Sequence, residues 1–281
     1  MKATHKILAA LFTFALIFPS GAYAQLQLGK KKGPTSKLFL AESKGKGTIQ
    51  TGGRIYEPKQ ASAFDAPGTI IETKGEAYDA FVYSNGTGMY IDANTRVEID
   101  RFVQEPFQPD RNNAEAEPSI SQSDVFIAEG FVGICTSQLV SGTSMIYSTP
   151  QASINIRGQK VAMQVTAEET IVYLLEGDVT VRSGSKDVGG TILHPGEQAV
   201  VRAGTADSPP TITVSPIDKD LLSSLDDRVA VACNAKKTVS FETGNDVTGN
   251  GGETQIIANP TVPMAMPTGL IVSPDRIQPG G

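Results

Sequence analysis

The chain has 281 residues and a formal net charge of −6 at pH 7, with 40% hydrophobic and 19% charged residues. This length suits one good-sized core with a linker or tail and argues against two large domains. The excess of acidic residues argues against a nucleic-acid partner, because surfaces that bind phosphate backbones carry an excess of Lys and Arg.

The first 24 residues have the pattern of a secretory signal peptide. Lys2 and Lys6 precede an apolar stretch at 7–18 that is shorter than a membrane-spanning helix, and no later stretch reaches that length. Ala22 and Ala24 give the small-x-small pattern of a cleavage site, so we expect cleavage after Ala24. Loss of the two lysines takes the net charge from −6 to −8. We expect a soluble exported protein, periplasmic or secreted, without a lipid anchor, since the cleavage region lacks a cysteine.

Residues 25–47 are rich in Lys, Gly, Ser and Pro, a composition typical of a basic linker. Within this segment only residues 37–41 have the pattern of a short strand. One interpretation is an arm attracted to anionic envelope polymers such as lipopolysaccharide, and the other is a solvated linker. The composition favours the linker.

From residue 48 the pattern changes to short alternating runs separated by turn residues, which is typical of half-buried strands. Val161, Met163 and Val165, for example, are expected to share one face of a strand. Residues 104–124 contain three prolines and lack an apolar period, which indicates an inserted surface loop. We therefore predict an all-β domain over residues 48–235, built as a short twisted solenoid-like unit or a sandwich.

An amphipathic helix is predicted at residues 216–234. Ser215 precedes Pro216, a residue favoured in the first turn, and an apolar residue recurs every four positions. The stripe comprises Ile217, Leu221, Leu225 and Val229. Such a stripe should dock onto the β core. Residues 236–281 are rich in Gly, Asn and Pro and predict a flexible tail.

Cys135 and Cys233 are the only cysteines. In an exported protein an even pair favours a disulfide, which would join the strand at 131–139 to the end of the helix. Two buried thiols are the alternative. A bridge that closes a loop near one hundred residues long contributes up to ~4–5 kcal/mol in the chain-entropy model.

Four short turn elements follow one another in the second half of the chain. They are Thr149-Pro150, Arg157-Gly158, Glu176-Gly177 and Pro195-Gly196. Turn-like segments at 69–75, 84–91 and 94–99 precede them in the first half. As a set, these elements resemble the FecR protein domain over residues 48–202. The sequence departs from the family pattern at Gln159, where Thr is usual, and at Asn85, where Asp is usual.

The resemblance implies an extracytoplasmic binding module with a structural role for the four motif elements. Members of the family sense iron-siderophore uptake and relay receptor state to a sigma factor through a cytoplasmic segment and a membrane helix. Neither relay part is recognisable in this sequence. The implied function is therefore a non-catalytic protein-interaction or sensing module whose partner is an envelope protein, with the oligomeric state left open.

Catalytic chemistry has little support. His194 is the only histidine outside the leader, and its Leu-His-Pro-Gly context indicates a solvated turn rather than a catalytic base. One histidine and two separated cysteines do not make a zinc site, and no phosphate-binding loop is present. We predict no catalytic, cofactor-binding or metal-ligating residue, and not an enzyme.

Two alternative functions stay open. A structural or polysaccharide-associated envelope protein would use the same scaffold, although the absence of Trp weakens glycan stacking. A metal-free cupin-like enzyme is a distant alternative, since the Glu-Gly and Pro-Gly-Glu elements resemble half of that pattern without its His-x-His pair. Asn85-Gly86-Thr87 matches a glycosylation sequon but is interpreted as a hairpin turn.

Overall fold

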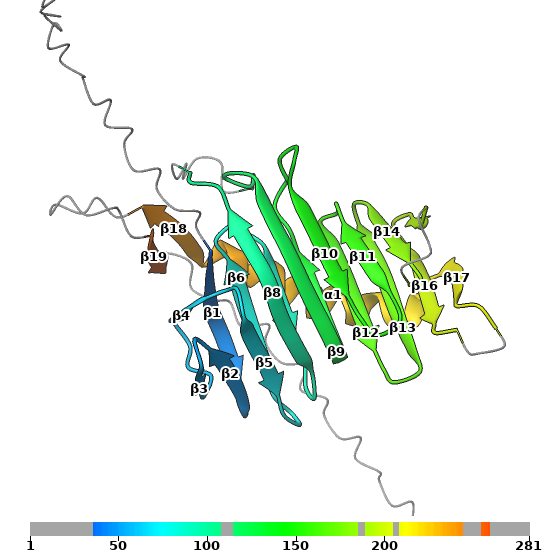
Figure 1. The fold of residues 1–281 in the computed structure, drawn as a ribbon, viewed down its shortest axis with the longest axis horizontal. Helices are drawn as coiled ribbons and strands as arrows, with labels where there is room; N and C mark the ends of the chain where they lie inside the picture. The colour runs from blue at the N-terminus through cyan, green and yellow to red at the C-terminus, as the bar shows by residue number, and fades with distance from the viewer. Residues whose placement is uncertain (1–35, 108–114, 185–188, 205–207, 244–253, 259–281) are drawn as a thin grey trace, which may run out of the picture. The chain divides into compact units, whose positions relative to one another are not determined.

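The computed structural model describes residues 36–107, 115–184, 189–204, 208–243 and 254–258 (Figure 1). Strands β1–β17 form a single hydrogen-bonded network, one helix follows, and β18 pairs with β19 in a separate two-stranded sheet. The predicted all-β fold with one C-terminal helix is confirmed. The network is open rather than closed into a barrel, so it lends no support to the cupin alternative. The expected signal peptide lies outside the described residues.

The network consists of two stacked sheets. Sheet A has the order β3 (Arg54–Tyr56), β2 (Gly47–Thr51), β5 (Thr69–Thr73), β8 (Arg96–Gln104), β9 (Ser121–Cys135), β10 (Ser144–Ser148), β11 (Ser153–Ile156), β14 (Val179–Arg182) and β15 (Thr191–Leu193). Sheet B has the order β4 (Ser62–Asp65), β1 (Lys37–Lys44), β6 (Tyr78–Tyr83), β7 (Gly88–Ile91), the end of β9, β12 (Lys160–Val165), β13 (Glu169–Glu176), β16 (Glu197–Arg202) and β17 (Thr211–Pro216). Neighbouring strands are antiparallel except β9 and β10.

Strand β9 belongs to both sheets. Its first part pairs with β8 and β10 in sheet A, and from Gly130 onward it pairs with β7 and β12 in sheet B. Gly130 has a φ of 101°, and a β-carbon there would clash with Thr95 Oγ1. Only glycine meets both conditions, so this residue allows the strand to pass from one sheet to the other.

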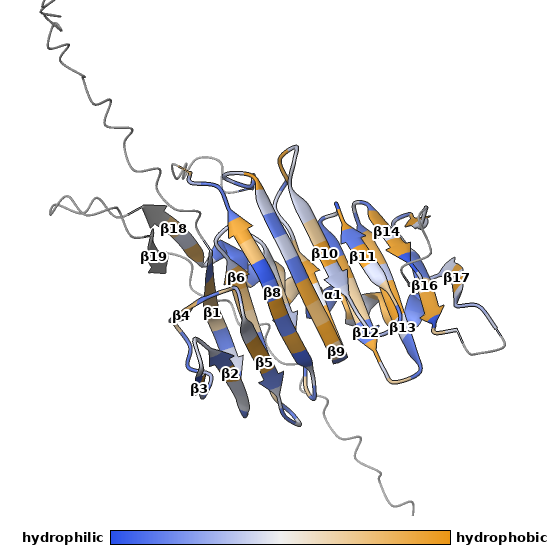
Figure 2. Ribbon diagram, viewed as in Figure 1, coloured by the Kyte–Doolittle hydropathy of each residue, from blue (hydrophilic) through white to orange (hydrophobic). Residues whose placement is uncertain are grey.

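The core lies between the two sheets. Hydrophobic and hydrophilic residues alternate along β8 and β9 in Figure 2, as expected for strands that bury one face. Val161, Met163 and Val165 share the inner face of β12 and are almost completely buried, which confirms the predicted alternation. On β6, Phe81 and Tyr83 face the same core.

Helix α1 (Lys219–Lys237) packs on the outer face of sheet B, so the molecule has three layers over this region. It begins later than predicted, because Pro216 still pairs with Glu197 as the last residue of β17. The cap is Asp218, whose side chain accepts a hydrogen bond from Asp220 N at 3.0 Å. Leu225 and Val229 are buried as predicted, whereas Leu221 is 40% exposed.

Three segments differ from the sequence interpretation. The expected basic linker contains β1, which includes the short strand expected at 37–41 and continues to Lys44. Residues 38–41 bury both faces, with Leu38 in the inter-sheet core and Phe39 beneath the end of α1. The expected loop at 104–124 is shorter, since β8 ends at 104 and β9 begins at 121. The expected tail contains β18 (Val239–Thr243) and β19 (Thr254–Ala258), and Phe241 is buried. In the described part of the chain, no helix has the length and hydropathy needed to cross a membrane.

Candidate functional site

The outer face of sheet B holds the helix closely because small residues lie beneath it. A β-carbon at Gly88 would clash with the carbonyl oxygen of Ala232, and one at Gly133 would lie 3.2 Å from Cγ2 of Val229. Ala162 is fully buried in the same cluster. The helix backbone therefore approaches the strands to a distance that larger side chains would prevent.

Polar and aromatic side chains fix the position of α1. Arg228 forms an ion pair with Asp92, and its guanidinium carbon lies 3.5 Å from the centre of the Phe131 ring. Tyr90 Oη donates to Asp92 Oδ1 at 2.9 Å. Burial raises the pKa of Tyr90 and lowers that of Arg228. Because each polar group has a partner, the cluster orients the helix rather than offering a reactive group.

Cys135 and Cys233 form the expected disulfide, with an Sγ–Sγ distance of 2.11 Å and a sequence separation of 98. The bond joins the last residue of β9 to α1. Its role is structural, since it locks the third layer onto the sandwich.

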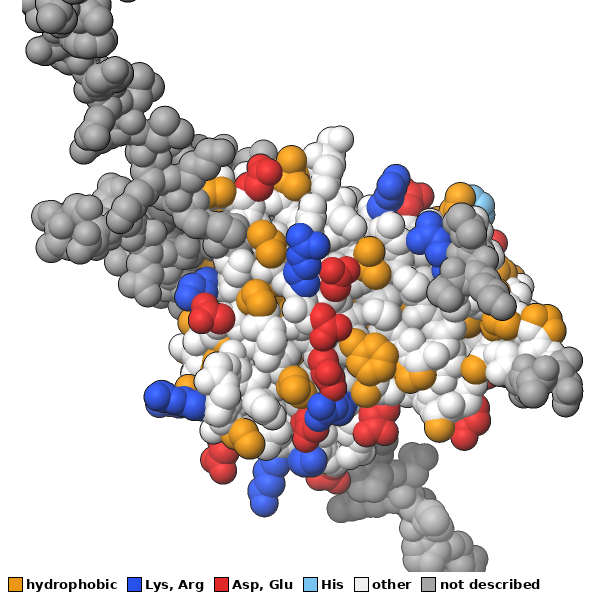
Figure 3. Space-filling model, in the orientation of Figure 1, with side chains coloured by type: hydrophobic (Ala, Val, Ile, Leu, Met, Phe, Trp, Pro, Cys, Tyr) orange, Lys and Arg blue, Asp and Glu red, His pale blue; other side chains and the backbone are white. Residues whose placement is uncertain are grey.

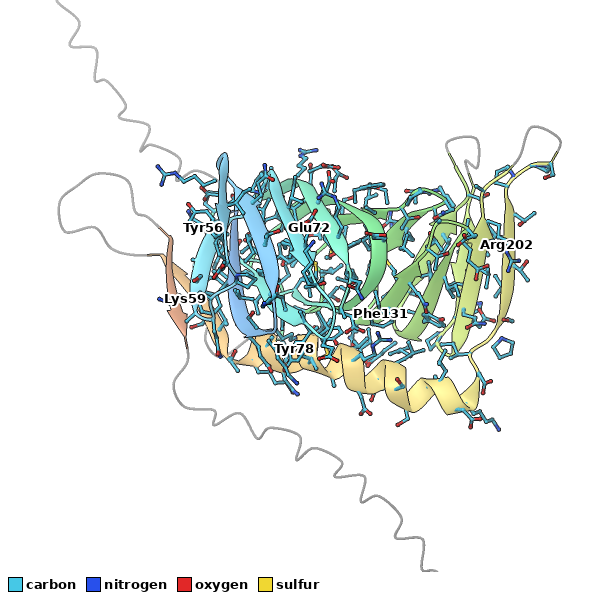
Figure 4. The ribbon with its side chains drawn as sticks, turned by 90° about the horizontal axis from the view of Figure 1, so that it is seen from below. Tyr56, Lys59, Glu72, Tyr78, Phe131 and Arg202 are labelled. Carbon is cyan, nitrogen blue, oxygen red and sulfur yellow. A yellow bond between two sulfur atoms is a disulfide. The ribbon has the colours of Figure 1, made fainter. Side chains whose placement is uncertain are left out.

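The outer face of sheet A is different, because in the part of the chain that the structure describes no helix packs against it. Register places its partly exposed side chains in rows across the strands. We call this surface the open face; it comprises Ile70, Glu72, Arg96, Glu98, Asp124, Phe126, Ile146, Ser148, Ser153 and Asn155. Figure 4 shows Glu72 on the opposite side of the sandwich from Phe131, Tyr78 and α1.

Charge and apolar groups are mixed on the open face. Arg96 forms ion pairs with Glu72 and with Glu98, the second at 2.7 Å. Phe126 lies opposite Glu98 on one side and Ser148 on the other. Figure 3 shows charged side chains in a stripe down the middle of this face, with hydrophobic side chains scattered on both sides. Phe126 and Ile146 are large apolar side chains beside this charged stripe, and both are partly exposed.

The Thr-Pro motif element lies in the turn between β10 and β11. Thr149 Oγ1 accepts a hydrogen bond from Ala152 N at 2.9 Å and lies 2.7 Å from Thr170 Oγ1. Thr170 donates in turn to Gln151 Oε1 at 2.7 Å, whereas Pro150 is exposed in the turn. These bonds tie the turn to β13.

The Arg-Gly and Glu-Gly elements cross one another where the chain passes between sheets. Arg157 N donates to Asp178 O at 2.9 Å, and the Cα of Gly158 touches the position that a β-carbon on Gly177 would take. Gly177 has a φ of 97°. The paired glycines let two chain segments touch, while Arg157 and Glu176 point to solvent.

The Pro-Gly element lies in the turn between β15 and β16. Gly196 N donates to Leu174 O at 2.8 Å, which anchors the turn to β13, and Pro195 is exposed. His194 is exposed in the same turn, where its backbone N donates to Glu197 Oε2 at 2.8 Å. Among the described residues, no group of three or more His, Cys, Asp or Glu residues has the geometry to hold a metal ion.

Two buried carboxylates were not singled out from the sequence. Glu117 accepts from Ser121 Oγ and Thr143 Oγ1, each at 2.6 Å, and from Asn85 Nδ2 at 3.2 Å. The predicted turn is present, because Gly86 N donates to Tyr83 O at 2.8 Å and Thr87 N donates to Asn85 Oδ1 at 3.0 Å. Asn85 is fully buried, so the sequon asparagine is inaccessible. Asp79 is 2% exposed, its Oδ2 has no partner among the described residues, and burial raises its pKa to about 6.

Comparison with known proteins gives limited similarity. No protein-family model matches the chain, and no curated protein matches it. Two crystal structures of a "putative anti-sigma factor" from Parabacteroides distasonis ATCC 8503 are 16% and 17% identical to it, each with a TM-score of 0.40. Each alignment covers 55% of this chain, and the chain spans 63% and 62% of those structures. Similarity at this level carries no argument about activity or partners.

Proposed function

We propose that this chain is an exported envelope protein whose sandwich is a non-catalytic protein-interaction or sensing module of FecR type. The resemblance of the turn motifs and the signal-peptide pattern support the class and the location. The disulfide fits an oxidising compartment. Helix α1 is held on sheet B by packing and by the disulfide, so its position is part of the fold. The open face is therefore the surface that we assign to a partner.

The observation that carries the proposal is the contrast between the two outer faces. Sheet B is covered by its own helix, and its polar groups are paired within the chain. Sheet A leaves Phe126 and Ile146 partly exposed beside the ion pairs of Arg96. An aromatic anchor amid paired charges gives a protein partner both apolar contact area and orientation.

The test is chemical cross-linking of the tagged mature protein in intact cells, followed by mass spectrometry of the captured proteins. We expect reproducible capture of a receptor or regulator of the envelope, and at least tenfold less capture for Phe126→Asp. Leu221→Asp is the matched control, because Leu221 is exposed on α1, away from the open face. Equal capture by both variants would show that the open face is not the docking surface.

A polysaccharide-associated role is the second candidate. Ser148 lies next to Phe126 across the β9–β10 ladder, and Ser153 and Asn155 follow on β11. Hydroxyl and amide groups thus share the open face with an aromatic ring, a combination that suits a sugar. Binding of the purified protein to isolated envelope glycan, lost in Phe126→Asp, together with capture of no specific protein in cells, would favour it.

A further inference from the structure

Strand β17 is the last strand of sheet B, and one of its edges faces away from the sheet. It pairs with β16 on one side, and no strand among the described residues pairs with it on the other (Figure 1). Residues 211–216 carry no charge, and Val214 is 38% exposed. An uncharged edge with unpaired backbone groups is a template for another strand.

The hydrogen-bond pattern shows which backbone groups face outward. Ile217 N donates to Gly196 O at 2.8 Å, and these residues continue the register that places Thr211 opposite Arg202. In an antiparallel ladder, alternate residues bond to the same neighbour. Residues 211, 213 and 215 therefore face β16, whereas the N–H and C=O groups of Ile212 and Val214 face away from it.

Prolines occupy the two outward positions on either side of this pair. Pro210 and Pro216 follow the same alternation as Ile212 and Val214, and proline has no N–H to donate. The outward edge therefore offers donors only at Ile212 and Val214. Any strand that pairs here is restricted to this short window.

The window is a chemical palindrome centred on Thr213. The sequence Pro210-Thr211-Ile212-Thr213-Val214-Ser215-Pro216 reads proline, hydroxyl, β-branched, hydroxyl, β-branched, hydroxyl, proline in either direction. We propose that β17 pairs with β17 of a second copy of this chain, antiparallel and about a twofold axis at Thr213. In this register Ile212 lies opposite Val214 of the second copy, and each donates to and accepts from the other.

A second copy matches this edge better than an unrelated strand. Pro210 of one copy lies opposite Pro216 of the other at both ends. Neither residue has an N–H group, so no N–H donor at these positions is left without an acceptor. The cross-strand pairs, Thr with Thr, Thr with Ser and Ile with Val, are types that stabilise antiparallel strands. The twofold pairing uses the whole window of each copy, and the result is a closed dimer rather than a growing fibre.

Side-chain burial supports the same pairing. Ile212 lies opposite Val201 and packs partly against the inter-sheet core, and Val214 lies opposite the buried Ala199 on the same side of the sheet. Both aliphatic residues extend the inner face of sheet B. In the dimer, each would cover the other copy's aliphatic side chain.

The first test is an engineered cross-link in the full mature chain. Both native cysteines are in the disulfide, so Thr213→Cys would carry the only free thiol. A non-hydrogen-bonded antiparallel pair has a Cα–Cα distance near 4.5 Å, which a disulfide spans. We expect a covalent dimer on non-reducing gels under mild oxidation. Ile55→Cys, on exposed edge strand β3, is the control and should remain monomeric. Equal cross-linking of both variants overturns the proposal.

The second test is the mass of the purified protein by light scattering and sedimentation. We expect a concentration-dependent dimer for the native chain and about tenfold or greater weakening for Val214→Pro, which removes an outward donor on each copy. The N–H of Val214 does not bond to β16, so the thermal unfolding curve of the variant should stay close to the native one. A native chain that remains monomeric, or a Val214→Pro variant that dimerises equally well, overturns the proposal even if the edge accepts another strand.

Discussion

Two parts of the sandwich follow the same path with different chemistry. The first arch, β5–β8, and the second arch, β11–β14, each run from sheet A to two paired strands of sheet B and back to sheet A. Ala80 opposite Tyr90 in the first arch matches Ala162 opposite Tyr173 in the second, and all four lie beneath or beside α1. The arches are therefore a structural repeat that sequence reading did not reveal.

The arches differ in how their crossing segments meet. The second closes by direct contact of Gly158 and Gly177. Both arches share one backbone bond at the crossing, from Thr73 N to Thr95 O at 3.0 Å in the first and from Arg157 N to Asp178 O at 2.9 Å in the second. The first adds a bond to a side chain, because Thr95 N donates to Thr73 Oγ1 at 3.1 Å. Asn94, with a φ of 50°, takes the place of Gly177 two residues before the returning strand. The same backbone path is therefore reinforced in two ways, by direct contact of two glycines in the second arch and by a threonine side chain in the first.

The arches also differ at one core position. Val161, opposite Leu174, is an ordinary core residue in the second arch. The matching residue of the first arch is Asp79, opposite Ile91, which leaves a carboxylate in the core. The first arch is therefore destabilised when this carboxyl group ionises, and the second arch has no such group at the matching position.

The largest expected effect is that of Gly177→Ala. The substitution combines an unfavourable positive φ with a clash against Gly158, and we expect a loss of about 2–5 kcal/mol in unfolding free energy. Gly196→Ala is the matched control, because its φ is 89° but no atom lies within 4 Å of the added carbon. Urea unfolding measures both, and equal losses would show that the contact of the two glycines is not tight.

Asp79→Asn should have an intermediate effect that depends on pH. Burial raises the pKa of Asp79 from 3.8 to about 6, so the folded state holds this proton more strongly than the unfolded state. The associated stability is present below pH 4 and is lost as pH rises through about 6. The unfolding free energy of the variant should therefore rise relative to that of the native protein as pH increases across this window, by at most about 3 kcal/mol.

Thermal unfolding of both proteins at pH 4, 5, 6 and 7 measures the gain. Val161→Asp is the reciprocal variant, and it should bring the same pH dependence to the second arch. A constant difference between native protein and Asp79→Asn over the whole range would contradict the assignment of the pH dependence to Asp79.

The smallest expected effect is that of Asn94→Ala. Asn tolerates the left-handed conformation better than Ala, and the side chain is exposed, so we expect a loss of about 1 kcal/mol. Asn94→Gly should recover most of it, because glycine has no β-carbon. Chemical unfolding compares the two, and equal losses would mean that the asparagine side chain, rather than the backbone conformation, matters at this turn.

The sequence was sufficient for the fold class, because strand alternation and the helical stripe are local patterns. The two cysteines, Cys135 and Cys233, were enough to predict the disulfide. The alternation of Val161, Met163 and Val165 was enough to predict the inner face of β12. The sequence indicated a short strand at 37–41, but neither its continuation to Lys44 nor its burial on both faces, with Leu38 and Phe39 on opposite sides. The lysines around this strand favoured a solvated linker for the segment as a whole.

The open face was beyond sequence reasoning for a physical reason. Phe126 and Ile146 sit on strands that also bury Val125 and Tyr147, so the pattern does not say which side a helix will cover. Gly88 appeared to be a turn residue, and only the structure shows that its missing side chain makes room for α1. Both features depend on contacts between segments far apart in the chain.

Strand β9 connects all three layers, through its ladders in sheets A and B and through Cys135 to the helix. When α1 lifts from the sheet in a local fluctuation, the disulfide keeps it tethered near its docking site. Redocking is then an intramolecular step at a high effective concentration, which favours rapid recovery of the covered state. Persistent exposure of the outer face of sheet B would need the disulfide to be reduced as well.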